Sequence, residues 1–302
     1  MSLVLQKGKR RMAWRMNAEG WRNGVIGVLF ACAVGAAAQQ QPSAGQKVIK
    51  DPVEYKTYMT ATNTQDSAGR AETLAAFVQQ YPHSVVLTDA LEQEMAAWQA
   101  AGDSEQVKRV AKSLLAMDAG NVRALGIVVA LDRVSAEKGD QAALSEMCLD
   151  ASGGMLAVPM WKKPVEMADA DFVTLSKLMN EIFIGAEGFC AVSQKNYSQA
   201  KDWLTRALKI DPADVEDTYE LAVAELEMTP QDADGLWYCA RAIHLAQGAA
   251  NPQGAADMMT DCKARYVKYH GAEDGWDALL GSSATQDAPP ADFEKQVKPA
   301  QK

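Results

Sequence analysis

Residues 181–212 read EIFIGAEGFCAVSQKNYSQAKDWLTRALKIDP, and this stretch gives the clearest indication of architecture. Apolar residues recur at helical spacing on both sides of Lys195-Asn196, which predicts two helices joined by a tight turn. Small and apolar residues stand where packed helices need close approach or a filled seam: Gly188, Ala200, Leu204 and Ala207. Asp211-Pro212 ends the second helix, because proline disfavours helix at the residue before it. The stretch therefore predicts an antiparallel helical hairpin.

The order of these residues resembles the tetratricopeptide repeat (TPR), a stacking helical hairpin of about 34 residues. With Glu181 as the first residue, marker positions 8, 20, 24, 27 and 32 of the family hold Gly188, Ala200, Leu204, Ala207 and Pro212. Position 11 departs from the pattern, because Ala191 stands where a larger residue is usual. The resemblance implies a stack whose concave face, built from the first helix of each hairpin, binds a protein or peptide segment.

Weaker copies surround this hairpin, and the resemblance covers about residues 51–250. A second copy starts near residue 88, with Trp98 at position 11 and Ala119 in place of the family's proline. Residues 71–81 look like the second helix of an earlier unit, and a fourth unit begins at Val215.

The repeat spacing fails in the middle of the chain. Ala119 and Pro212 are 93 residues apart, which fits neither two repeats nor three. Gly153-Gly154 and the proline-bounded run at 159–164 interrupt the helical pattern, so we expect a short helix over 140–148 and an irregular insertion at about 150–168.

These patterns together predict an all-α fold, an α-solenoid of antiparallel helical hairpins over residues 51–280. A helix from residue 252 should cap the open end of the stack, because a terminal repeat lacks a partner on one side. Residues 281–302, with Pro289-Pro290 and few apolar side chains, predict a disordered tail.

The N-terminal segment resembles an export signal. Residues 1–24 hold six basic residues and one acid, the apolar run 25–34 follows, and Ala36-Ala37-Ala38 forms a small-residue cleavage site. The apolar run is too short to span a bilayer, so we expect a signal peptide over 1–38 and a linker over 39–50, with no membrane span after cleavage. A bacterial lipid anchor at Cys32 is the alternative, since LFAC resembles a lipobox. Either reading predicts an exported protein of the periplasm or cell envelope.

Cleavage would leave four cysteines: Cys148, Cys190, Cys239 and Cys262. An even number in an exported chain permits disulfides, with three connectivities open. Each cysteine lies in a helix-like stretch among apolar neighbours, and we favour buried thiols over bridges.

Charge and motifs exclude several classes of function. The 302-residue chain carries 30 basic and 39 acidic residues, a net charge of −9, which argues against nucleic-acid binding. Without residues 1–38 the counts become 24 and 38, or −14. The histidines His83, His244 and His270 lack metal-ligand spacing, and the nucleophile-elbow, phosphate-loop and dinucleotide motifs are absent. We assign no catalytic, cofactor-binding or metal-binding residue.

Two residue sets remain as weaker candidates. The acidic pairs Glu216/Asp217 and Glu225/Glu227 are interpreted as solvated helix faces. Trp161, beside Lys162-Lys163 in the expected insertion, is a candidate partner contact.

The leading hypothesis is an exported, non-enzymatic scaffold that binds another protein in the cell envelope. The alternative is an all-helical envelope hydrolase or carbohydrate-binding protein, which would gather Trp161, Trp237 and nearby acids in one deep pocket. A purely structural subunit of a larger envelope assembly is the third.

Overall fold

The computed structural model describes residues 47–164, 167–249 and 251–300, and every regular element in these ranges is a helix. The elements are α2 (Pro52–Thr62), α3 (Ser67–Gln80), α4 (Leu87–Ala101), α5 (Ser104–Met117), α6 (Val122–Glu137), α7 (Gln141–Ala157), η1 (Val158–Met160), α8 (Asp169–Ser193), α9 (Tyr197–Leu208), α10 (Val215–Glu227), α11 (Asp234–Gly248), α12 (Pro252–His270), α13 (Trp276–Ser283) and α14 (Phe293–Gln296). No helix in the described part of the chain is long and apolar enough to cross a bilayer. The expected signal peptide and Cys32 lie outside the described residues.

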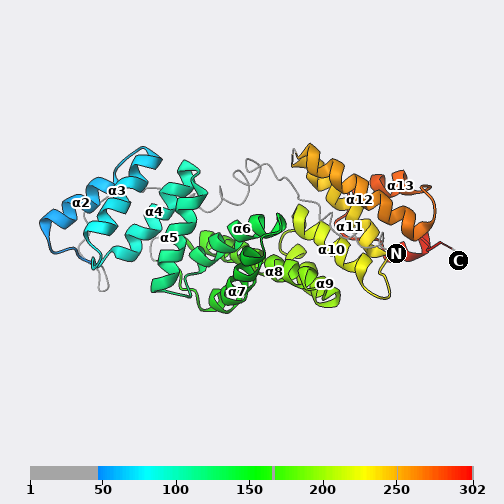
Figure 1. The fold of residues 1–302 in the computed structure, drawn as a ribbon, viewed down its shortest axis with the longest axis horizontal. Coiled ribbons are helices and arrows are strands. Elements are labelled where there is room, and N and C mark those ends of the chain that lie inside the picture. The colour runs from blue at the N-terminus through cyan, green and yellow to red at the C-terminus, as the bar shows by residue number, and fades with distance from the viewer. Residues whose placement is uncertain (1–46, 165–166, 250, 301–302) are drawn as a thin grey trace, which may run out of the picture.

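The helices form an elongated, bent row that follows chain order from α2 at one end to α13 at the other (Figure 1). Each helix packs mainly on its neighbours in sequence, and the buried residues form a series of small clusters between adjacent hairpins. This nearest-neighbour packing defines an α-solenoid. The predicted all-α solenoid is confirmed.

Side-chain caps fix the helix starts. Asp51, Asp66, Asp103 and Asn121 each accept hydrogen bonds from backbone amides in the first turn of the helix that follows, and these amides have no partner inside the helix. At the other end, Gly102 stops α4 with a φ of 78°, a conformation that costs glycine little.

The hairpin predicted at residues 181–212 is formed by α8 and α9 with the expected packing. Ala200 and Leu204 are fully buried, and a Cβ on Gly188 would collide with the Leu204 side chain. Glycine at this position therefore lets the two helices approach closely.

The predicted start of the irregular insertion, at about residue 150, is wrong. α7 does not end near Cys148 but continues through Gly153-Gly154 to Ala157, the short helix η1 follows directly, and α8 begins at Asp169. The reason is tertiary: the Phe183 ring packs directly on Gly154, where any Cβ would collide with it. Packing against Phe183 offsets the low intrinsic helix propensity of glycine, which costs about 1 kcal/mol relative to alanine.

The prediction of a disordered tail is also wrong for residues 281–300. α14 returns the chain to the C-terminal core, where Phe293 and Val297 are buried and Phe293 meets Trp237 edge-on. The Ala300 amide donates to the Tyr269 carbonyl at 2.7 Å. Two buried apolar side chains anchor a segment whose composition alone looked disordered.

The favoured interpretation of buried free thiols is wrong. Disulfides join Cys148 to Cys190 and Cys239 to Cys262, with Cα–Cα separations of 5.9 and 5.6 Å, well within the range that a bridge requires. The first links α7 to α8 and the second links α11 to α12. Each bridge thus ties the second helix of one hairpin to the first helix of the next.

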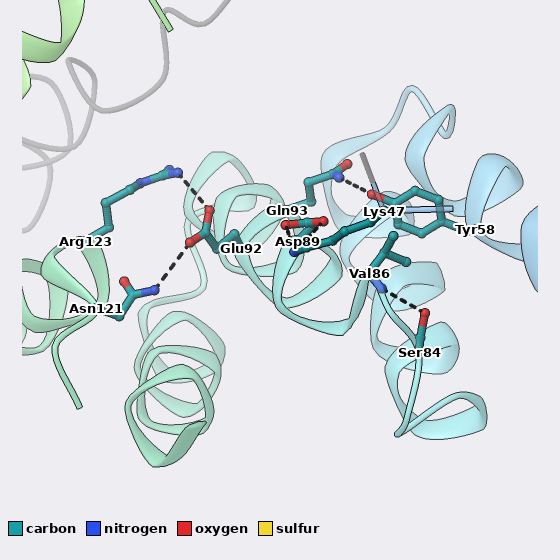
Figure 2. Close-up of polar contacts among 9 residues, drawn as sticks. All are labelled: Lys47, Tyr58, Ser84, Val86, Asp89, Glu92, Gln93, Asn121 and Arg123. Atoms are coloured by element: carbon teal, nitrogen blue, oxygen red, sulfur yellow. Dashed lines mark hydrogen bonds and ion pairs between the residues drawn. The ribbon is translucent and has the colours of Figure 1, made fainter. Parts of the chain in front are cut away.

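Polar contacts hold the N-terminal hairpins together around α4 (Figure 2). Gln93 donates to the Tyr58 hydroxyl of α2 at 2.7 Å. Glu92 accepts from Asn121 at 3.3 Å and pairs with Arg123 at 3.5 Å, both at the start of α6. α4 therefore contacts both neighbouring hairpins through partly exposed side chains.

Candidate binding groove

The first helices of successive hairpins, α6, α8, α10 and α12, line a groove in the C-terminal half of the row, with α7 contributing one residue. In Figure 1, α6 and α10 lie nearer the open side of the bend than α7 and α9. The groove has a volume of about 300 Å³, at the low end of the range for ligand pockets. Its apolar lining residues are Ala136, Leu144, Phe189, Val192, Val223 and Met258.

Charged side chains border this apolar lining. Glu137 comes from α6, Glu216 and Glu220 come from α10, and Asp261 and Arg265 come from α12. Four carboxylates therefore face the groove against one guanidinium. An apolar surface with an acidic border favours ligands that are themselves apolar and cationic.

Arg133 of α6 lies beside the groove and is buried. Its Nη2 donates to Asp217 Oδ1 of α10 at 2.8 Å, and its Nε lies 3.4 Å from both Glu137 and Glu216. The guanidinium carbon also lies 5.6 Å from the centre of the Phe189 ring of α8. One arginine thus connects three first helices.

Gly185 of α8 makes the contact between Arg133 and Asp217 sterically possible. A Cβ on this residue would collide with the Asp217 carboxylate. Asp217 is fully buried, and its second oxygen has no hydrogen-bond partner among the described residues. The carboxylate is held in place chiefly by Arg133.

Negative charge exceeds positive charge around Arg133, and the carboxyl pKa values reflect it. Burial raises the pKa of Glu220 to about 7 and that of Asp214, which caps α10, to about 7. Burial, reinforced by Asp214 and Asp217, raises the pKa of Glu181 to about 9. These groups are therefore partly or largely protonated near neutral pH unless a further cation approaches.

The α12 border of the groove is more evenly balanced. Tyr219 donates to Asp261 at 2.8 Å, and Arg265 pairs with Asp261 at 2.6 Å and with Glu227 at 2.8 Å. Arg265 is thus already matched by two carboxylates, and the unbalanced negative charge lies on the α6 and α10 side.

The residues singled out from the sequence do not form this groove. Trp161 is half-buried and packs edge-on against Phe172 with ring centres 5.1 Å apart, while the neighbouring Lys163 pairs with Asp169 at 2.6 Å. Trp237 is buried in the C-terminal core. The two indoles belong to separate clusters, so the deep pocket expected for a carbohydrate-binding protein does not form around them.

The acidic pairs are not simply solvated faces, as the sequence interpretation had them. Asp217 pairs with Arg133, and the buried Glu225 pairs with Lys201 at 3.0 Å. The sequence contained one usable signal for this: Asp132 and Arg133 follow the apolar run 124–131 of α6, and charged residues buried there need partners.

The three histidines serve structural contacts or lie exposed. His244 Nε2 lies 2.5 Å from the Leu280 carbonyl and His270 Nδ1 lies 2.8 Å from the Lys298 carbonyl, while His83 is exposed. Within the described residues, no group of three His, Cys, Asp or Glu side chains is placed to hold a metal ion.

Comparison with known proteins assigns this chain to no family. No family model matches the chain, and no curated protein matches it. Among solved structures, a crystal structure of PilW, a widely conserved type IV pilus biogenesis factor, aligns over 78% of this chain and 100% of its own length. The sequence identity is 15% and the TM-score is 0.39.

Proposed function

We propose that this protein is an exported, non-enzymatic scaffold of the cell envelope, which binds a segment of a partner protein in the groove between α6, α8, α10 and α12. The observation that supports this most directly is the position of the groove. Its walls come from the first helices of successive hairpins, so one bound segment would contact several repeats at once.

Two further features support the export part of the proposal. Residues 1–38 have the pattern of a signal peptide. The two disulfides are compatible with an oxidising compartment, since such bonds rarely persist in a reducing cytosol.

Site-specific photo-crosslinking in the native cell tests the proposal. A photoreactive phenylalanine analogue replaces Val192 or Val223, which line the groove, or Asp202, an exposed residue of α9 that does not. We expect the same protein to be crosslinked from both groove positions and not from Asp202. Equal adducts at all three positions, or none at either groove position, would contradict the proposal, as would turnover of a substrate by the purified protein.

A further inference from the structure

The charges around the groove do not balance, and the imbalance is local. Arg265 pairs with both Asp261 and Glu227, so the α12 side has one cation for two carboxylates. On the other side, Glu137, Glu216, Asp217 and Glu220 face the groove or lie beside it, and Arg133 is the cation that they share. Among the described residues, three carboxylates thus share the Arg133 guanidinium, and Glu220 lies beside them.

Glu220 is the member of this set that Arg133 does not hold directly. Glu137, Glu216 and Asp217 each lie within 3.4 Å of the guanidinium. Glu220 has neither a hydrogen bond nor an ion pair with another residue in the described ranges, although it lines the groove and is half-buried. A half-buried carboxylate is partly desolvated, and a cationic ligand would offset that cost.

On the basis of the proposed function, we infer that the partner segment carries a Lys or Arg side chain that pairs with Glu220, flanked by apolar side chains that cover Phe189, Val192 and Val223. The groove offers a complementary surface to both the apolar and the basic side chains of such a segment. Its apolar lining gains from burial at about 25 cal/mol per Å², and its border supplies charge complementarity.

A second copy of this chain fits the groove less well. The chain has a net charge of −9, and −14 without residues 1–38, so two copies repel each other. A volume of about 300 Å³ also suits a few side chains of an inserted segment better than a broad helical surface. The occupant is therefore a basic, apolar segment of another protein.

The affinity of the groove for a cationic side chain should depend on pH. The charged groups that act on Glu220 are Arg133 and Glu137 from α6, Asp217 from α10 and Arg265 from α12. Burial raises the pKa of Glu220 to about 7, so the free groove holds a proton on this group below that pH. A bound ammonium or guanidinium group would favour the ionised carboxylate and release the proton. Binding should therefore strengthen as pH rises from 6 to 8.

The test is a selection of phage-displayed random nonapeptides. The target is the protein that remains after the expected signal peptide, residues 1–38, is removed, with both disulfides formed. Selected peptides should contain Lys or Arg beside Leu, Ile, Val or Phe. The best peptide, made synthetically, should bind about tenfold more weakly to Glu220→Gln, a loss of about 1.4 kcal/mol, because the neutral amide removes the charge from the hydrogen bond. Glu105→Gln, an equal change of charge on exposed α5, is the matched control and should leave affinity unchanged.

A second measurement uses the unaltered protein, so it does not depend on the variant folding normally. Replacing the basic residue of the peptide by Gln should also cost about tenfold, and the rise in affinity from pH 6 to 8 should disappear with it. Selection of acidic or uncharged peptides, equal binding to Glu220→Gln, or no selectable peptide would overturn the inference. If groove crosslinks form nevertheless, the proposed function stands and only the basic character of the partner is wrong.

Discussion

Two polar links between first helices can be compared, one in each half of the row. In the N-terminal half, Glu92 of α4 meets Asn121 and Arg123 of α6 at 3.3 and 3.5 Å, with the glutamate side chain 33% exposed (Figure 2). In the C-terminal half, Arg133 of α6 meets Asp217 of α10 at 2.8 Å, and Asp217 is fully buried. Both links join first helices of different hairpins, but only the first link is exposed to water.

The difference lies in how strongly each link is expected to stabilise the fold. An exposed ion pair contributes little, because water and salt screen it. A buried pair is strongly destabilising when one partner is lost, because the other remains as a buried charge. Both disulfides also lie in the C-terminal half, on either side of the groove helices α8, α10 and α12. The N-terminal half also holds buried carboxylates, Glu94 paired with Arg109 and Asp132 paired with Lys108, so the feature that sets the groove region apart is the two disulfides.

The largest effect should come from Arg133→Met. Methionine replaces the aliphatic part of the arginine side chain but leaves Glu137, Glu216 and Asp217 without their shared cation. We expect a loss of about 3–5 kcal/mol in the free energy of unfolding at pH 7, measured by urea titration. The loss should shrink at pH 5, because burial raises the pKa of Glu137 and this carboxyl binds a proton more readily there. A loss below about 1 kcal/mol would show that the buried link matters no more than a surface pair.

Removing the disulfides should have the next largest effect. The bridges close loops of 42 and 23 residues, so Cys148→Ala with Cys190→Ala, or Cys239→Ala with Cys262→Ala, should each lose about 2–4 kcal/mol. Amide hydrogen exchange then localises the change. Protection should fall in α7–α8 or α11–α12 and stay unchanged in α3–α5, where the described residues hold no bridge. Equal loss of protection in α3–α5 would contradict the division between the two halves.

A smaller effect, of opposite sign, is expected from Glu181→Gln. Burial, with Asp214 and Asp217 nearby, raises the pKa of Glu181 from 4.5 to about 9, and Arg133 offsets this only in part. The folded protein thus keeps a proton that the unfolded chain loses above pH 4.5. Stability should fall as pH rises from 5 to 8, and the variant should be more stable at pH 8 on the order of 2 kcal/mol.

Thermal melts of the wild type and Glu181→Gln between pH 5 and 8 measure this effect, with the exposed Glu105→Gln as control. The two curves should converge near pH 5, where both side chains are neutral in the folded protein. Parallel curves across the whole range would show that Glu181 is ionised in the folded state.

Local sequence predicted the hairpins well because their determinants are local. Ala200 and Leu204 are read at fixed spacing on one helix, and capping residues such as Asp103 stand directly before the helices they start. The error at Gly153-Gly154 has a non-local cause, since the Phe183 ring that accommodates Gly154 comes from the next helix. The preference for free thiols over bridges was wrong for the same reason, since each disulfide joins cysteines on two different helices.

The groove could not have been predicted in this way. Its residues come from separate helices spread between Ala136 and Arg265, and their convergence depends on the rotation from one hairpin to the next. The charges of Glu216 and Asp217 also look alike in sequence, although Asp217 is buried and Glu216 is not fully so. What the sequence did provide was a hypothesis about the surface, since the resemblance to TPR proteins implies partner binding on the first helices.

The smallest effect should come from Glu92→Ala, and it completes the comparison. The substitution removes both contacts to the start of α6, but Asn121 still caps that helix through the Ala124 amide at 3.0 Å. Exposed pairs contribute about 0–1 kcal/mol, so the variant should lose less than about 1 kcal/mol in urea titration, and 1 M NaCl should reduce the difference further by screening. A loss near that of Arg133→Met, unaffected by salt, would mean that the N-terminal hairpins are fixed as firmly as the groove, and that burial does not explain the difference between the two halves.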